Sequence, residues 1–132
     1  MSLAELEVAV TDAFADRPEV VAVYLFGSVA RGAASARSDV DLGVLYTKAP
    51  STLLSMPFDA EADLSARFAR PVQIVVLNSA PADLVHRVLR DGKLLLERDR
   101  SHRIRFEVAS RNTYFDMAPI WRQYRRLTAG SP

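Results

Sequence analysis

The chain has 132 residues, a net charge of +1, 49% hydrophobic residues and 25% charged residues, a composition typical of one soluble globular domain. It contains no cysteine and two histidines, which excludes disulfides and thiolate metal sites and argues against a histidine-based zinc site. Its apolar runs are far shorter than the ~20 residues of a membrane span. No secretory signal pattern is found at the N-terminus, so a cytoplasmic protein is expected.

The first third of the sequence predicts a helix, a strand, a turn and a second strand. Residues 2–5, Ser-Leu-Ala-Glu, have the form of a capping box, and apolar residues then recur at helical spacing to about residue 16. Residues 20–26 are β-branched and aromatic, which favours a buried strand. Gly27 and Ser28 form a turn that can begin a short helix, and a small, polar loop leads to a strand over 40–46.

The remaining sequence alternates helical and extended patterns, predicting a helix over 58–70, a strand over 72–77, a helix over 82–91 and a strand over 93–97. Gly92 is a natural residue to end the helix over 82–91. Asp99 can cap a long C-terminal helix, which Pro119 should kink or break into pieces of about 100–116 and 119–127.

These elements predict an α/β (α+β) fold with a short mixed sheet of about four strands and four or five helices. Residues 1–132 form a single domain in this prediction, and 99–128 form its C-terminal helical extension. Residues 98–132 carry eight arginines and three acids, a net charge of +5 that leaves −4 for the remainder. This basic end could contact nucleic acid or an acidic partner, or form a solvated helix face.

The C-terminal helix also carries an apolar stripe, formed by Ile120, Trp121, Tyr124 and Leu127. The stripe could pack on the parent domain. It could also form a partner interface, because Trp, Tyr and Arg are enriched in such surfaces.

Residues 25–44, LFGSVARGAASARSDVDLGV, hold the densest chemical pattern in the chain. A Gly27-Ser28 turn after a strand lets backbone N–H groups approach a phosphate closely. Asp39 and Asp41, two residues apart on a strand, point to the same face and lie roughly 6–7 Å apart along it. Divalent cations take such oxygen ligands, so the stretch predicts a phosphate cradle beside a magnesium site.

Arg31 and Arg37 flank this cradle and could reach the phosphates. Each of these assignments has a simpler alternative. The arginines could be ordinary surface residues, Gly27 and Ser28 an ordinary turn, and the two aspartates loop-edge carboxylates.

The order Gly27, Ser28, ten residues, Asp39, one residue and Asp41 resembles the G-S-x10-D-x-D signature of minimal nucleotidyltransferases, the smallest members of the DNA polymerase beta-like nucleotidyltransferase superfamily. The resemblance covers roughly residues 20–98. It implies a short mixed sheet with helices on one face and the aspartates on the open face. It further implies that Asp39 and Asp41 are catalytic ligands of Mg²⁺ and that Gly27 and Ser28 hold the phosphates of ATP.

One position departs from the family pattern. The third carboxylate of the superfamily lies in a strand resembling V-D-h-V-D-L-N, where h is apolar, and the matching residues 72–78 read V-Q-I-V-V-L-N. Gln73 therefore occupies the expected aspartate position. Glutamine retains one carbonyl oxygen, but it has no charge and cannot act as a base.

Stand-alone members of the family are similar to the antitoxin half of two-gene modules whose toxin is a helical HEPN-domain ribonuclease. The resemblance implies that AMP is transferred from Mg–ATP to a hydroxyl of that toxin, and the expected acceptor is a tyrosine. The alternative is a weakened or inactive fold that neutralises the toxin by binding alone. Nucleic-acid binding by the C-terminal arginines is not expected, because no aromatic–basic RNA-binding motif accompanies them. The sequence does not decide between a homo-oligomer and a hetero-oligomer.

Overall fold

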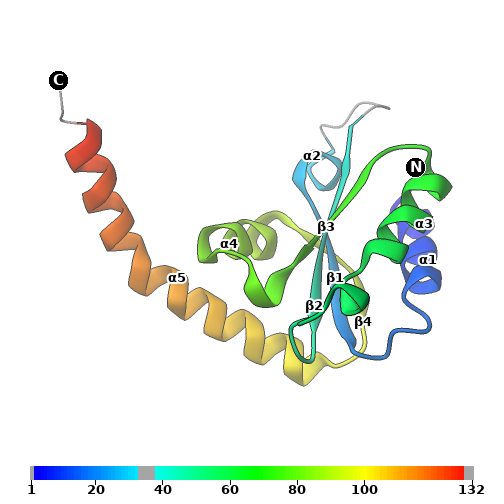
Figure 1. The fold of residues 1–132 in the computed structure, drawn as a ribbon. Helices are drawn as coiled ribbons and strands as arrows, with labels where there is room; N and C mark the ends of the chain where they lie inside the picture. The colour runs from blue at the N-terminus through cyan, green and yellow to red at the C-terminus, as the bar shows by residue number, and fades with distance from the viewer. Residues whose placement is uncertain (1, 33–37, 130–132) are drawn as a thin grey trace.

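The computed structural model describes residues 2–32 and 38–129, and a four-stranded sheet lies at the centre of this part of the chain (Figure 1). Its strands are β1 (Val20–Phe26), β2 (Val40–Tyr46), β3 (Val72–Val76) and β4 (Lys93–Glu97). They lie in the order β3-β2-β1-β4. β1 is antiparallel to both β2 and β4, whereas β2 and β3 are parallel. The predicted mixed sheet is confirmed.

The helices are α1 (Leu3–Ala13), α2 (Gly27–Ala30), α3 (Phe58–Phe68), α4 (Ala82–Asp91) and α5 (Arg100–Ala129), with 3₁₀ turns η1 (Leu53–Ser55) and η2 (Leu77–Ser79). The predicted capping box begins α1: the Glu5 N–H donates to Ser2 Oγ at 3.2 Å, and the Ser2 N–H donates to Glu5 Oε2 at 3.4 Å. None of the helices in the described ranges is long and apolar enough to cross a membrane.

Helices cover both faces of the sheet, which corrects the expectation that they pack on one face only (Figure 1). One face packs against α1 and α3 through residues that include Leu6, Val10, Phe14 and Leu64. The other packs against α4 and the start of α5 through residues that include Val85, Val88 and Phe106. The cause lies in β1, whose residues 20–25 are all buried. A strand that is apolar on both faces must be covered on both.

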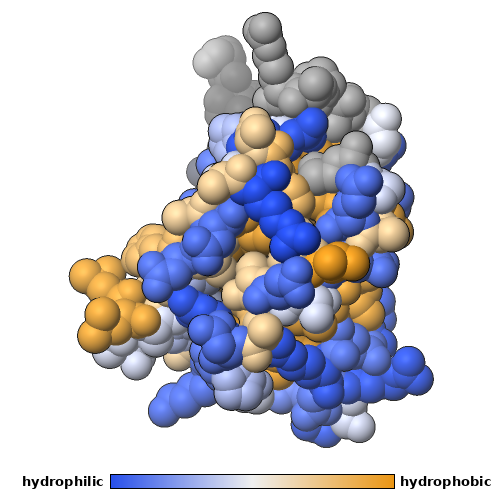
Figure 2. Space-filling view, turned by 90° about the vertical axis from the view of Figure 1, so that its right-hand side faces the viewer, coloured by the Kyte–Doolittle hydropathy of each residue, from blue (hydrophilic) through white to orange (hydrophobic). Residues whose placement is uncertain are grey.

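Figure 2 views the molecule from the α1 and α3 side, where hydrophilic side chains interrupt the hydrophobic ones across the surface. This pattern is that of an ordinary solvated outer layer. The two helices that form it therefore serve mainly to bury the first face of the sheet.

The predicted break of the C-terminal helix at Pro119 is wrong, because α5 continues as one helix from Arg100 to Ala129. Proline removes one backbone donor and crowds the preceding turn, but here the helix passes through it. The rings of Tyr114 and Trp121 lie 5.4 Å apart and bridge the turn that contains the proline. The N-terminal cap is as predicted, since the His102 N–H donates to Asp99 Oδ1 at 3.0 Å.

Polar and aromatic contacts hold the first half of α5 against the domain. The Arg103 guanidinium donates to Glu97 at 2.6 Å and to Glu107 at 2.5 Å, and the Tyr24 hydroxyl donates to Glu107 at 3.2 Å. Burial, and next the charge of Glu107, raise the pKa of Tyr24, so the phenol remains protonated as a donor. Beyond these contacts the last turns of α5 extend away from the sheet (Figure 1).

Gly92 ends α4 with an extended backbone rather than the left-handed one that often closes a helix. A Cβ at Gly92 would overlap the Val88 carbonyl oxygen and lie 3.0 Å from the Leu25 carbonyl oxygen. Close approach of two backbone segments, and not a special φ, therefore requires glycine here.

We predict that Gly92→Ala lowers the free energy of unfolding by about 1–3 kcal/mol, because the atoms in the way belong to the backbone. Gly43→Ala is the matched control. A Cβ at Gly43 would lie 3.0–3.3 Å from atoms of the Leu77 side chain and would overlap no backbone atom, so a shift of this side chain by a few tenths of an ångström suffices and the loss should stay under about 1 kcal/mol. Urea unfolding of both variants measures the difference, and equal losses would contradict the backbone explanation.

Candidate functional site

Three strand ends meet at one edge of the sheet, where the sequence predicted a site. Because β1 runs antiparallel to β2, and β2 parallel to β3, the end of β1 lies beside the starts of β2 and β3 (Figure 1). In register, Asp41 pairs with Phe26 on one side and with Gln73 on the other. The Gly27-Ser28 turn, the aspartate pair and Gln73 are therefore neighbours in space.

Gly27 and Asp41 are in direct contact. Gly27 has φ +77, a left-handed conformation that glycine adopts without strain. A Cβ added to Gly27 would overlap Asp41 Oδ2 and lie 3.4 Å from Asp41 Cγ. Only glycine at this position lets the carboxylate lie against the turn.

Gly27 and Ser28 are the first two residues of α2. N–H groups in the first turn of a helix have no acceptor within the helix, so they can donate to an anion. Both residues are half-buried at the end of β1. The sequence predicted a phosphate cradle here, and the structure places this turn beside the Asp41 carboxylate.

Asp39 and Asp41 differ in exposure. Asp39 precedes β2 and is exposed, whereas Asp41 lies within β2 and is half-buried. Burial raises the pKa of Asp41 above its ordinary value, and the nearby charge of Asp39 raises it further. Two carboxylates that repel each other in this way favour a cation between or beside them.

The aspartates point toward the side of the sheet that carries α4 and α5. Alternate residues of a strand share a face, so Asp41 shares its face with Gly43 and Leu45. Gly43 lies against Leu77, and Leu45 packs in the same cluster as Val85 and Val88 of α4. The sequence predicted that this face is open. It is instead covered by α4 near Leu45, and it is exposed at Asp39, at the start of β2.

Gln73 has an exposed side chain beside Asp41. No acid from elsewhere joins the pair: across residues 2–32 and 38–129, the Asp, Glu, His and Cys side chains form no group of three or more that could hold a metal ion. The acids nearest to Gln73 in sequence are Asp59, Glu61 and Asp63 on α3, which packs on the opposite face, and Asp83 in the first turn of α4.

The two flanking arginines have different outcomes. Arg31 follows α2 and is exposed, and its charge adds to the lowering of the Asp91 pKa, which hydrogen bonds from Arg90 cause in the first place. Arg37 lies outside the described residues. No sequence signal marked Asp91, because only the contact between α2 and α4 brings it near Arg31.

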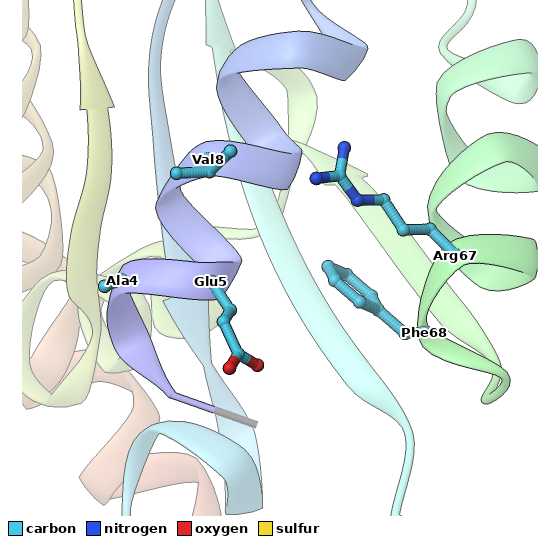
Figure 3. A pocket seen from close by; sticks show the side chains of 5 residues that line it. All are labelled: Ala4, Glu5, Val8, Arg67 and Phe68. Carbon is cyan, nitrogen blue, oxygen red and sulfur yellow. The ribbon is translucent and has the colours of Figure 1, made fainter.

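A hollow of about 630 Å³ lies between α1 and α3, lined by Ala4, Glu5, Val8, Arg67 and Phe68 (Figure 3). Arg67 also donates to Asp12 at 3.0 Å. These two helices pack on the face of the sheet opposite the aspartates. This hollow is therefore separate from the candidate site, despite its size.

The sequence profile of the family described as polymerase beta, nucleotidyltransferase matches residues 9–101 of the chain. The chain therefore belongs to this nucleotidyltransferase family. A comparison with curated proteins gave no significant match.

Solved structures with a similar fold include two toxin–antitoxin complexes. One, a toxin–antitoxin with AMP-PNP, has a TM-score of 0.77 and 23% identity, covering 92% of this chain and 98% of that one. The other contains a tri-AMPylated Shewanella oneidensis HEPN toxin with an MNT antitoxin, and its matching chain has a TM-score of 0.74 and 21% identity, covering 96% of this chain and 99% of that one.

A structure described as a minimal nucleotidyltransferase is 32% identical to the chain, with a TM-score of 0.56. The match covers 70% of this chain and 95% of that one. Together with the family match, it confirms the resemblance that the glycine, serine and aspartate spacing predicted.

We predict that Gly27→Ala and Gly32→Ala each lower the free energy of unfolding by about 1–2 kcal/mol, because both glycines have positive φ. Only Gly27→Ala should weaken the binding of Mg–ATP as well. An added Cβ displaces Asp41 in that variant, whereas one at Gly32 meets no atom within 4 Å. Thermal unfolding and calorimetric titration with Mg–ATP separate the two effects. Equal affinity in both variants would argue against a nucleotide site at Gly27.

Proposed function

We propose that this protein is the antitoxin of a HEPN toxin and transfers AMP from ATP to a hydroxyl, that of a tyrosine, on this partner. The observation that carries the proposal is the contact between Gly27 and Asp41, which joins a phosphate-binding turn to a carboxylate pair. The AMP-PNP and tri-AMPylated complexes of similar fold support the choice of nucleotide and partner. In this proposal residues 1–132 are one catalytic domain, 99–128 are its helical extension, and the compartment is the cytoplasm.

The donor set fits a divalent cation in part. Asp39 and Asp41 would hold Mg²⁺. Burial, and next the charge of Asp39, raise the pKa of Asp41, so a cation beside this carboxylate would be favoured. Bound magnesium would offset the charge on the phosphate oxygens. Gln73 could add one neutral carbonyl oxygen from the neighbouring strand.

The residues of the chain have separable tasks in this reaction. The N–H groups of Gly27 and Ser28, with the Ser28 hydroxyl, would bind the terminal phosphates, and Arg31 would add positive charge at the end of α2. The acceptor oxygen forms a bond to the α-phosphorus, the bond from that phosphorus to the bridging oxygen breaks, and pyrophosphate leaves. The orientation of the phosphates is the main contribution of the turn.

The proton of the acceptor hydroxyl is the weak point of this site. Gln73 cannot accept it, so it must pass to water. A tyrosine hydroxyl, with a pKa of about 10, releases a proton far more readily than an aliphatic alcohol. A phenolic acceptor therefore suits a site that lacks a base beside Asp41.

Gln73 also supports a second candidate function, in which the protein neutralises the toxin by binding alone. Loss of a general base typically lowers a rate by about 10²–10⁴-fold. A site that retains the turn and the aspartate pair could bind Mg–ATP and transfer AMP too slowly to matter. The two candidates share a partner and differ in whether the partner becomes labelled.

We predict that the protein labels the HEPN-domain protein encoded beside it when both are incubated with Mg²⁺ and ATP labelled at the α-phosphate. Asp41→Asn should abolish labelling, because the amide keeps the shape of the carboxylate and removes its charge. Asp63→Asn, an exposed acid on α3 on the other face, is the matched control and should label as the wild type does. Gel autoradiography and intact mass of the partner measure the transfer.

We further predict that Gln73→Asp raises the labelling rate by about 10²–10⁴-fold, because it places a carboxylate in register with Asp41. Single-turnover labelling over time measures this gain. A tight complex of the two proteins without labelling by the wild type would favour neutralisation by binding. No gain from Gln73→Asp would argue against the role assigned to this position.

A further inference from the structure

One side of α5 carries a regular row of residues, which we call the outer stripe, and all but the half-buried Ala118 are exposed: Ile104, Val108, Arg111, Phe115, Ala118 and Arg122. Successive members are four, three, four, three and four residues apart. This spacing keeps side chains in line along a helix and is the one used when two helices pack along their length. Three large apolar members are unusually open, with exposures of 44% at Ile104, 48% at Val108 and 61% at Phe115.

The exposure of the outer stripe does not come from a detached helix. A parallel row, one residue earlier at most positions, is half-buried against the domain: Arg103, Phe106, Ser110, Tyr114, Met117 and Trp121. The ring of His86 on α4 stacks on Tyr114 with centroids 3.6 Å apart. This inner row fixes the rotation of α5, so the outer stripe is presented in one direction.

The predicted stripe of Ile120, Trp121, Tyr124 and Leu127 is divided by this arrangement. Trp121 turns inward toward Tyr114 at 5.4 Å. Ile120 stays 57% exposed. The packing reading of the sequence thus applies to Trp121, and the partner reading stays a prediction for Ile120.

We propose that the outer stripe is the docking surface for an amphipathic helix of the partner, and that this helix carries acidic side chains opposite Arg111 and Arg122. The apolar members of the stripe would be buried against the apolar face of that helix. A guanidinium enclosed between two helices needs a carboxylate partner, because an unpaired buried charge is costly. The inference rests on the proposed function, which supplies a helical partner.

Charge argues against a second copy of this chain as the occupant. The outer stripe contains two arginines and no acid, so pairing two copies along it would enclose four guanidinium groups with no carboxylate from either stripe. The nearest acid on the inner side, Glu107, already binds Arg103 and Tyr24. An acidic partner helix satisfies both arginines, which a second copy does not.

The position of α5 suits the proposed reaction. α4 and α5 pack on the face of the sheet toward which Asp41 points, and α4 contacts both α2 and α5. A partner held on the outer stripe is therefore bound on the same side of the sheet as the phosphate turn. Binding energy from this surface would help to position the acceptor.

Cysteine labelling tests the surface directly, because the chain contains no cysteine and each variant then has a single thiol. Val108→Cys places it in the outer stripe. Val8→Cys, 55% exposed on α1, is the matched control on the other face. The HEPN-domain partner should abolish maleimide labelling of Val108→Cys and leave that of Val8→Cys unchanged.

A second measurement tests the charge pairing. Arg122→Glu should weaken binding of the partner about 30-fold or more, because it sets like charges against each other. Lys48→Glu, the same charge change at an exposed loop position after β2, should bind as the wild type does. Circular dichroism confirms that both variants keep the helix content of the wild type.

The outcomes separate this inference from the proposed function. If the wild type binds the partner, while Val108→Cys stays reactive in the complex and Arg122→Glu binds normally, the docking surface is wrong and the proposed function stands. If the wild type does not bind the partner at all, the proposed function fails and this inference fails with it. If the chain alone sediments as a dimer that Arg122→Glu dissociates, the stripe binds a second copy, which also overturns the inference.

Discussion

The contact between Gly27 and the Asp41 carboxylate is the constraint on which the rest of the site depends. It requires a left-handed glycine directly after β1, next to the point where Phe26 of β1 pairs with Asp41 of β2. It also sets a turn rich in N–H donors beside a carboxylate. The N–H groups would attract a phosphate, whereas the carboxylate would repel it. A divalent cation between the carboxylate and a phosphate would resolve that conflict, which agrees with the nucleotidyltransferase family of the chain.

The second organising feature is the apolar character of β1 on both faces. It requires helices above and below the sheet, and the two layers then serve different purposes. α1 and α3 close one face with an ordinary solvated exterior (Figure 2). α4 and α5 close the far end of the other face and leave the strand ends with Asp39 and Gln73 exposed. The candidate site therefore lies where the second layer stops short of the edge of the sheet.

In the proposed function, Gln73 would separate nucleotide binding from nucleotide transfer. In the sequence, Gln73 was only a mismatch to the third carboxylate of the family pattern. In the structure it lies in register beside Asp41, where a carboxylate would complete the aspartate pair. In that proposal the turn and the aspartate pair would hold a phosphate and a cation without β3, whereas removal of a proton would need a base. A protein that must also bind its target tightly can tolerate a slow chemical step, because binding by itself already occupies the target.

The sequence determined most elements of the fold, because strand and helix patterns are local: the strands β1, β2 and β4 and the helix α4 have the predicted bounds. It also predicted that the Gly27 turn lies beside the Asp39 and Asp41 pair, since all three lie in or next to two strands that are consecutive along the chain. Its local rule failed at Pro119, where aromatic contacts across the turn accompany an unbroken helix. Only the tertiary structure decided that Gln73 lies beside Asp41, that helices cover both faces, and which row of α5 is exposed. Each of these depends on the parallel pairing of β3 with β2 or on the packing of α4 and α5. Such contacts join segments that are distant along the chain, and local sequence patterns do not predict which distant segments meet.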